Sequence, residues 1–317
     1  MRLVLHVGYP KTGTTALQYG IFKKHNKINY ISREHIKKEN IKDPLLYREN
    51  SLSSLSKTEE YRKILLKSFS EDKLNIISEE LLLASSLSFT RYPYPFVFCR
   101  DAVAMSFVLS KILEGCDVTI LITIRKQKSF LKSYYAEAQS KLSKFGLFNR
   151  FGKWTNYLIQ HAESYILPNL DYYKSVQLYK NTFGEENVKV LVFEELKENP
   201  RSYLNRLSEI LGLDLSDYEE DIQKKCNVRK KKKGYEVKGS SLKSIIYYRK
   251  IKYFGNKPWN LPGWSESLLK TKIPFTSKTL KLEYTKEQER HLFNIFKESN
   301  KKLDEKFNLG LKEYGYY

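Results

Sequence analysis

Short apolar runs alternate along the chain with longer segments of helical periodicity. The apolar runs lie at residues 3–7, 74–77, 118–124 and 188–193, and their continuous hydrophobic character is typical of parallel strands buried on both faces. Helical patterns are predicted at residues 14–25, 59–69, 102–113, 129–141, 172–183, 200–211 and 285–307. Strands that alternate with helices predict an α/β fold, in which helices flank a central parallel sheet on both faces.

The domain organisation follows from length and from one change in composition. A chain of 317 residues can hold one large α/β domain, and it shows no internal repeat. Residues 226–277 are less regular and rich in Lys, Gly, Trp and Pro. We therefore expect a single domain over residues 1–317, with an irregular loop or lid region around 226–277.

The sharpest motif lies where the first predicted strand turns into a helix. Residues 8–15 read Gly-Tyr-Pro-Lys-Thr-Gly-Thr-Thr, and at such a turn free backbone N–H groups and the positive end of the helix dipole bind phosphate. Gly8 and Gly13 have the spacing of a Walker A loop, but the lysine is Lys11, and Thr14 stands where a nucleoside triphosphatase needs it. The motif predicts a P-loop-type three-layer fold and disfavours a magnesium-dependent kinase or NTPase, which stays the alternative.

A second anion anchor is predicted at the end of the third apolar run. Arg125 ends that run, and Ser133 stands eight positions later, near the start of the next predicted helix. Arginine can bind an anion through two parallel hydrogen bonds, and a hydroxyl can add a third. An arginine at a strand end is often only solvated or salt-bridged. The interpretation of Arg125 and Ser133 as an anion anchor therefore depends on their combination with the phosphate loop.

The loop, together with Leu17-Gln18 after it, resembles the 5′-phosphosulfate-binding loop of the sulfotransferases that use 3′-phosphoadenosine 5′-phosphosulfate (PAPS), above all bacterial and carbohydrate sulfotransferases. The resemblance implies PAPS as the donor cosubstrate, adenosine 3′,5′-bisphosphate as its product, and no metal. It also implies that Lys11 contacts the 5′-phosphosulfate and stabilises the bridging oxygen as the S–O bond breaks. The residues that would hold the 5′-phosphate are Thr12, Gly13, Thr14 and Thr15.

Other parts of the resemblance concern the 3′-phosphate and the branch of the family. Sulfotransferases bind the 3′-phosphate with an arginine and a serine at the spacing of Arg125 and Ser133. Ala16 stands where many cytosolic members have a tryptophan, which points away from the steroid- and phenol-sulfating branch. The lysine run 230–233 could cover the 3′-phosphate, although such a run is more often a solvated loop.

Transfer to a hydroxyl needs a general base, and the sequence offers a carboxylate pair for it. Glu79 and Glu80 follow the second apolar run, so they should emerge at the carboxyl edge of the sheet, where ligands of open α/β sheets bind. The related glycan sulfotransferases often place a glutamate after the corresponding strand. The pair could equally complement a helix dipole. His35 is a weaker base candidate, and His6 is expected to be a hydrogen-bonded core histidine.

Composition bears on the acceptor and on the compartment. The formal net charge is +20, from 56 Lys+Arg against 36 Asp+Glu, which favours a polyanionic partner or reflects a lysine-rich genome. Together with the aromatic residues, it favours a glycan or another hydroxylated acceptor. A nonenzymatic polyanion-binding protein is a second alternative, although no nucleic-acid motif is evident. Three scattered cysteines and no long apolar stretch predict a cytoplasmic protein without disulfides. The resemblance to bacterial sulfotransferases implies a bacterial origin.

Overall fold

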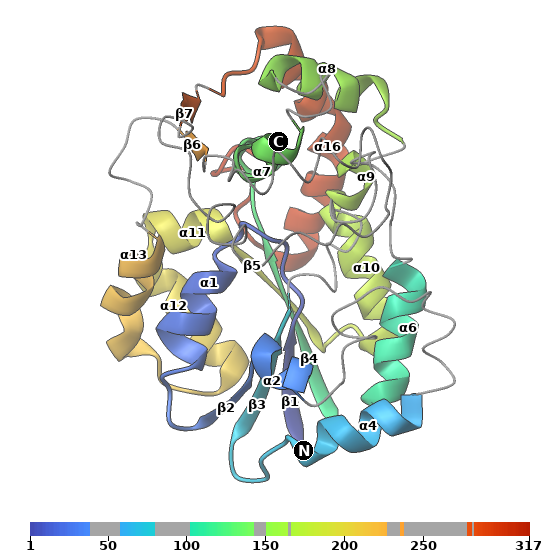
Figure 1. Cartoon of the computed structure of the whole chain (residues 1–317), viewed down its shortest axis with the longest axis vertical. Coiled ribbons are helices and arrows are strands. Elements are labelled where there is room, and N and C mark those ends of the chain that lie inside the picture. The colour runs from blue at the N-terminus through green and yellow to red at the C-terminus, as the bar shows by residue number, and fades with distance from the viewer. Residues whose placement is uncertain are drawn as a thin grey trace, which may run out of the picture.

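The computed structural model describes residues 1–38, 58–79, 102–142, 150–163, 166–226, 235–237, 278–280 and 282–317. Within them, five parallel strands form one sheet in the order β2-β3-β1-β4-β5 (Figure 1). The strands are β1 (Arg2–His6), β2 (Ile28–Ile31), β3 (Leu74–Ser78), β4 (Asp117–Ile124) and β5 (Val188–Val192). The predicted α/β fold with a central parallel sheet is confirmed, and β2 is an additional strand.

The strand order places β1 in the middle of the sheet. From β1 the chain runs outward to β2, returns to β3 beside β1, and then crosses to β4 on the other side. The direction of winding therefore changes next to the carboxyl end of β1. In open α/β sheets the ligand crevice lies at this switch point.

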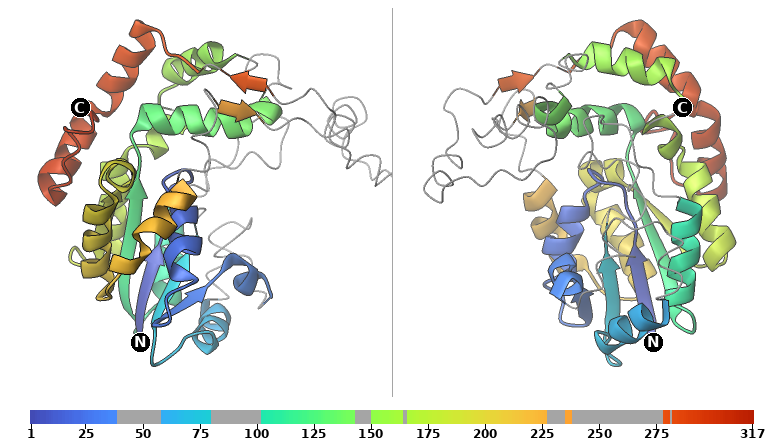
Figure 2. Two further views of the ribbon diagram at one scale, coloured as in Figure 1. Left: turned by 90° about the vertical axis from the view of Figure 1, so that its left-hand side faces the viewer. Right: turned by 45° about the vertical axis from the view of Figure 1, so that its right-hand side comes forward.

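Helices cover both faces of the sheet (Figure 1). One face carries α1 (Thr14–Leu17), the π-helical turn η1 (Gln18–Phe22), α11 (Phe193–Glu198), α12 (Pro200–Leu211), the 3₁₀ turn η5 (Ser216–Tyr218) and α13 (Glu219–Cys226). The other carries α4 (Thr58–Lys67), α6 (Ala102–Ile112), α9 (Ile166–Asn169), α10 (Tyr172–Phe183) and α16 (Lys286–Phe307). The remaining helices are α2 (Arg33–Lys38), α7 (Gln127–Leu142) and α8 (Phe151–Gln160). Figure 2 shows α7 lying across the carboxyl ends of the strands.

The two layers of helices pack on alternate residues of the strands. Leu3 and Leu5 of β1 join one apolar cluster, with side chains of α6, α10 and α16. Val4 joins the other cluster, with side chains of α1 and α12. Successive side chains of a strand point to opposite faces, so the three consecutive apolar residues Leu3, Val4 and Leu5 of β1 fill both interfaces of a three-layer structure.

Capping residues mark the ends of α12 and the start of α16. Asn199 caps α12, because its side-chain oxygen accepts a hydrogen bond from the backbone N–H of Ser202 at 3.1 Å. Gly212 ends the same helix in the left-handed conformation, with φ 65°. Thr285 begins α16 in a capping box with Gln288. These local signals therefore position the helices as the sequence predicts.

The helix predicted at 14–25 is less regular than expected. Its α-helical part ends at Leu17, and η1 continues it to Phe22. Gly20 of η1 packs against α13, where a Cβ would lie 3.2 Å from Ile222 Cγ2. The π-helical turn thus lies where α13, from far along the chain, packs closely against it. No local sequence pattern reveals this contact.

Most of the region 226–277 lies outside the described residues. Its described part includes β6 (Tyr235–Val237), which pairs antiparallel with β7 (Lys278–Leu280). The prediction of a single domain stays a prediction. Among the residues that the structure describes, no helix is long and apolar enough to cross a membrane.

Candidate active site

The phosphate loop connects the end of β1 to the start of α1, as the motif predicts. Two backbone hydrogen bonds hold it to β4: Val7 N–H donates to Leu121 O at 2.9 Å, and Tyr9 N–H donates to Thr123 O at 3.3 Å. Lys11 and Gly13 adopt positive φ angles of 70° and 87°. A left-handed lysine is uncommon and persists only where the surroundings enforce it. The loop is therefore a strained turn held by the central strands.

Gly13 is required by both its conformation and its surroundings. Besides its positive φ, a Cβ there would lie 2.8 Å from Leu196 Cδ2 and 3.0 Å from Phe193 Cδ2. Only glycine lets the loop pass this close to α11. The packing brings the residues after β5 against the loop.

Lys11 forms an ion pair with Glu137 of α7. The lysine side chain is 20% exposed and the glutamate side chain 62%, so the pair lies at the surface of the site. Because the glutamate is largely exposed, solvent screens this pair, and the pair contributes little to stability. The Lys11 side chain is partly accessible, so an anionic ligand can replace the carboxylate.

Arg125 lies directly beside this loop. Its Nη1 donates to the Lys11 carbonyl at 2.9 Å, and its Nε donates to Ser129 Oγ at 2.7 Å. Its guanidinium also lies 4.7 Å from the centre of the Phe193 ring. The structure thus brings Lys11 and Arg125, which are far apart in sequence, to one edge of the sheet.

Three polar side chains of α7 follow Arg125 along the chain. Ser129, Ser133 and Glu137 follow at intervals of four residues, which places them on one side of the helix. Ser133 is buried at 5% exposure. Sequence reasoning singled out Ser133 but missed Ser129 and Glu137, although the four-residue repeat was visible in the sequence.

The threonines of the loop differ in exposure. Thr12 is fully buried and its hydroxyl points inward, to Tyr9 O at 2.5 Å and Thr123 Oγ1 at 2.7 Å. Thr14 is also buried, whereas Thr15 is exposed in the first turn of α1. What Thr12 can offer an anion is therefore its backbone N–H, while its hydroxyl is already used.

Of the two predicted base candidates, the structure describes one. Glu79 directly follows β3, is 3% exposed, and donates its backbone N–H to His6 O at 3.0 Å. This contact puts it beside the end of β1, where the loop begins. Glu80 lies outside the described residues, as do lysines 230–233. His35 contacts Ser68 Oγ at 2.8 Å through Nε2.

Glu194, in the first turn of α11 after β5, has a structural role. The Glu194 carboxylate accepts hydrogen bonds from Lys126 N–H at 3.2 Å and from Tyr316 Oη at 2.7 Å. Burial raises the pKa of Glu194 above its ordinary range. Lys126 lies between the end of β4 and the start of α7, so its hydrogen bond to Glu194 fixes the turn that joins them.

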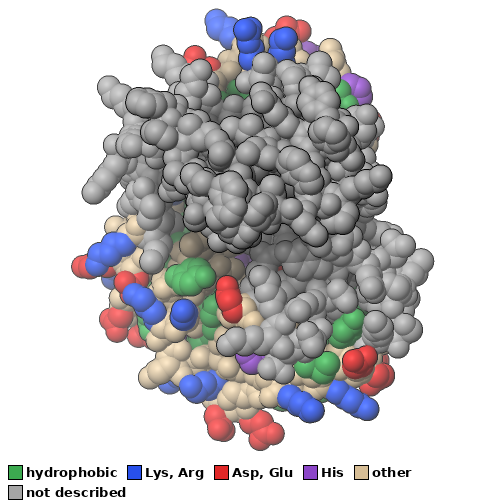
Figure 3. All heavy atoms as spheres, in the orientation of Figure 1, with side chains coloured by type: hydrophobic (Ala, Val, Ile, Leu, Met, Phe, Trp, Pro, Cys, Tyr) green, Lys and Arg blue, Asp and Glu red, His purple; other side chains and the backbone are tan. Residues whose placement is uncertain are grey.

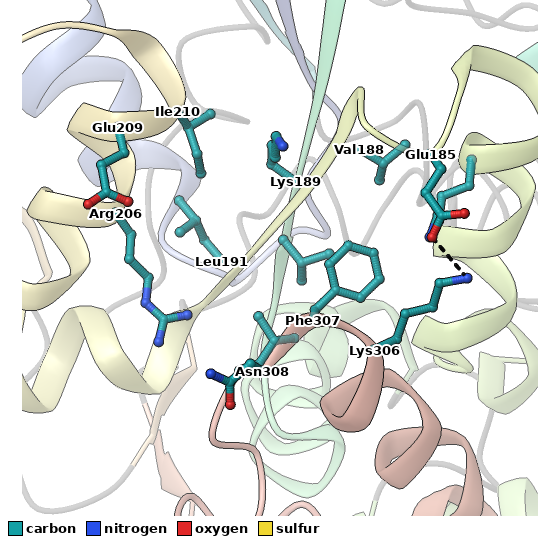
Figure 4. Close-up of a pocket in the computed structure, with 13 residues that line it drawn as sticks. Glu185, Val188, Lys189, Leu191, Arg206, Glu209, Ile210, Lys306, Phe307 and Asn308 are labelled. Carbon is teal, nitrogen blue, oxygen red and sulfur yellow. Dashed lines mark hydrogen bonds and ion pairs between the residues drawn. The ribbon is translucent and has the colours of Figure 1, made fainter.

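A separate groove of about 520 Å³ lies along the edge of β5 (Figure 4). Its lining includes Lys189 of the strand, Arg206 of α12 and Lys306 of α16, whose ammonium pairs with Glu185 at 3.3 Å. Neither Lys11 nor any other residue of the phosphate loop lines it. The groove is therefore distinct from the candidate active site.

Comparison with known proteins identifies the family. The model of the sulfotransferase domain family matches residues 2–257. No curated protein matches the sequence significantly.

Three solved structures are similar to this chain. The sulfotransferase from Alicyclobacillus acidocaldarius is 16% identical, with 67% of this chain and 81% of that chain covered and a TM-score of 0.41. The sulfotransferase domain of the Synechococcus PCC 7002 olefin synthase is 12% identical, with 69% and 76% covered and a TM-score of 0.36. Retinol dehydratase, solved with androsterone and the inactive cofactor PAP, is 14% identical, with 94% and 81% covered and a TM-score of 0.41. Because the family model matches most of the length of this chain, the chain belongs to the sulfotransferase domain family.

Proposed function

We propose that this sulfotransferase takes a sulfuryl group from PAPS and transfers it by in-line displacement to a hydroxyl or amine of a glycan. The observation that carries the proposal is the junction of two anion anchors, in which Arg125 Nη1 binds the carbonyl of Lys11 at 2.9 Å. A donor with a phosphosulfate on the 5′ oxygen and a phosphate on the 3′ oxygen of its ribose needs two such anchors. A nucleoside triphosphate would instead need a lysine at position 14, where this chain has threonine.

The roles of the loop residues follow from their positions. The backbone N–H groups of Thr12 to Thr15 surround the start of α1 and would hold the 5′-phosphate. Lys11 would exchange Glu137 for the phosphosulfate and stabilise the negative charge that develops on the bridging oxygen. Arg125 would bind the 3′-phosphate together with Ser133, and Ser129 holds the guanidinium in place.

The general base is proposed among the carboxylates at this edge. Glu79 or Glu80 would remove the proton of the attacking hydroxyl, because both follow β3 and Glu79 lies beside the end of β1. Glu137 is a third candidate, since its carboxylate already touches the ammonium of Lys11. Single Glu→Gln substitutions at 79, 80 and 137 distinguish them, because removal of the true base should lower turnover about 100-fold or more.

A glycan acceptor is supported by the basic balance of the chain. The aromatic residues support it less, because Trp154 is fully buried against Tyr135 and Phe151 and belongs to the core. Figure 3 shows Lys and Arg interspersed with Asp and Glu over the described part of one face. The cytoplasmic and bacterial assignments stay predictions.

The proposal is tested by transfer of radiolabelled sulfate from PAPS to a panel of acceptors. We expect label on a glycan in the wild-type reaction, and at most a trace with Lys11→Ala. The matched control is Lys189→Ala, which removes an equal charge from the groove at β5. Label on a hydroxylated lipid alone would refute the glycan acceptor, and no transfer to any acceptor would refute the proposed reaction.

A further inference from the structure

A continuous chain of buried side-chain hydrogen bonds lies beneath the phosphate loop. Gln18 Nε2 donates to Ser78 Oγ at 2.9 Å, and Ser78 Oγ lies 2.8 Å from His6 Nδ1. On the other side of the ring, His6 Nε2 lies 3.2 Å from Thr123 Oγ1. Thr123 Oγ1 then lies 2.7 Å from Thr12 Oγ1, which lies 2.5 Å from Tyr9 O. We call these side chains the loop network; they are Gln18, Ser78, His6, Thr123 and Thr12.

The far end of the loop network fixes the direction of the hydrogen bonds between Tyr9 O and His6 Nε2. The Tyr9 carbonyl can only accept, so the Thr12 hydroxyl donates to it. Thr12 Oγ1 therefore accepts from the Thr123 hydroxyl, and Thr123 Oγ1 accepts from His6 Nε2–H. Each hydroxyl on this side of the ring donates once and accepts once.

His6 carries its proton on Nε2, because Thr123 Oγ1 has no hydrogen left to donate to the ring. With its proton on Nε2, the ring presents a bare Nδ1, which accepts from the Ser78 hydroxyl. Ser78 in turn accepts from the Gln18 amide, which can only donate from its nitrogen. The hydrogen bonds alone also permit a protonated ring, but complete burial makes the ring neutral, because desolvation lowers the pKa of His6 to about 3.

Gly8 gives independent support for the loop network. A Cβ at this position would lie 2.0 Å from Thr123 Oγ1 and 2.9 Å from His6 Nε2. Its φ is not in the left-handed region, so its backbone conformation does not require glycine. What requires glycine is the space that the His6–Thr123 hydrogen bond occupies.

We propose that His6 and Thr123 are positioning residues for the donor site. Their hydrogen bonds turn the hydroxyl of Thr12 inward and hold the loop in its strained shape, with Lys11 and Gly13 on either side of Thr12 in positive φ. Such strain persists only where neighbouring contacts enforce it. Without them, the backbone N–H groups would lose the orientation that binds the phosphate. The inference rests on the proposed function, because the ligand held is the donor.

The loop network also connects the donor side to the base side of the site. Ser78 ends β3, and Glu79 follows it directly. β3 and β4 lie on opposite sides of β1, so the three residues Ser78, His6 and Thr123 join the carboxyl ends of three adjacent strands. The position of the loop is thereby fixed relative to the strand end that carries Glu79.

The test compares two substitutions at Thr123. Valine keeps the shape but removes the hydroxyl, which leaves Thr12 and His6 each without one hydrogen-bond partner, whereas serine keeps the hydroxyl. We expect Thr123→Val to weaken calorimetric binding of adenosine 3′,5′-bisphosphate about tenfold or more, and Thr123→Ser to stay within about twofold of wild type. Ser78→Ala, at the other end of the loop network, should weaken binding of the bisphosphate several-fold.

The matched control is Asn75→Ala, at the opposite end of the same sheet. Asn75 is also fully buried, and its Oδ1 accepts from Asn29 Nδ2 and from Ser70 N–H, both at 2.8 Å. This variant should lower the melting temperature and leave bisphosphate affinity unchanged at temperatures where it is folded.

The outcomes are distinguishable. Bisphosphate affinity within about twofold of wild type in both Thr123→Val and Ser78→Ala would overturn the positioning role, even if both variants melt earlier. If Thr123→Val does not fold, Ser78→Ala alone decides. Failure of the wild-type protein to bind the bisphosphate would instead refute the proposed donor.

Discussion

His6 should make the stability of this protein depend on pH in a way that one substitution can isolate. The ring is completely buried, its partners are the hydroxyls of Ser78 and Thr123, and burial lowers its pKa to about 3 from an ordinary value of 6.5. In the unfolded chain the ring is protonated below pH 6.5, whereas in the folded protein it stays neutral until about pH 3. The unfolded state therefore binds more protons between these values, and stability falls as the pH falls below 6.5.

The magnitude follows from the two pKa values. Between pH 8 and pH 5, a pKa of 6.5 in the unfolded chain and about 3 in the folded protein gives a loss of about 2 kcal/mol from His6 alone. For a chain of 317 residues, this corresponds to a fall of about 3 °C in melting temperature. Carboxylates and other histidines titrate over the same pH range, so the unfolding free energy of the wild-type protein alone does not isolate the contribution of His6.

The substitution His6→Asn isolates the contribution of His6 to the pH dependence of stability, because asparagine carries a polar side chain that does not titrate. The variant should be less stable than wild type at pH 8, since it cannot complete both hydrogen bonds. The difference in unfolding free energy between the two proteins, measured by urea denaturation, should then shrink by about 2 kcal/mol as the pH is lowered to 5. A difference that stays constant over this range would show that His6 titrates alike in both states, and would refute its assignment as a buried neutral ring.

Three further predictions concern the donor site and the fold. Lys11→Ala should lower turnover on the order of 100- to 1000-fold in the transfer assay, while its melting temperature stays near wild type because its ion-pair partner Glu137 is largely exposed and screened by solvent; near-normal turnover would contradict the assigned role. Arg125→Ala should weaken calorimetric binding of adenosine 3′,5′-bisphosphate about tenfold or more but that of adenosine 5′-phosphate much less, and equal losses would argue against a contact with the 3′-phosphate. Thr285→Ala breaks the capping box of α16 and should cost about 1 kcal/mol in urea denaturation with turnover unchanged; an altered turnover would mean that α16 acts on the site.

Much of the fold could be predicted, because local signals decide it. The apolar run of β1 reads as a strand buried on both faces, and the glycines and caps at Asn199, Gly212 and Thr285 mark helix ends through their own backbone chemistry. β2 escaped prediction because it is short and half polar. Its Asn29 is satisfied by Asn75 of β3 and by Ser68 O, and these contacts exist only in the folded sheet.

The candidate site was predictable in its parts but not in its assembly. The residues of the loop, Arg125 and the carboxylate after β3 are visible in the sequence, because strand ends and glycines mark them. The contact of Arg125 with the Lys11 carbonyl, and the inward hydroxyl of Thr12, depend on which strands become neighbours. Strand order is a property of the whole chain, so no local pattern contains it.

Calorimetric titration of the wild-type protein with adenosine 3′,5′-bisphosphate, beside a titration with ATP and magnesium, decides which nucleotide the loop binds. We expect tight binding of the bisphosphate and much weaker binding of ATP–magnesium, because Lys11 lies within the loop and Arg125 joins it as a second anchor. Preference for ATP–magnesium, or no binding of either nucleotide, would contradict this expectation.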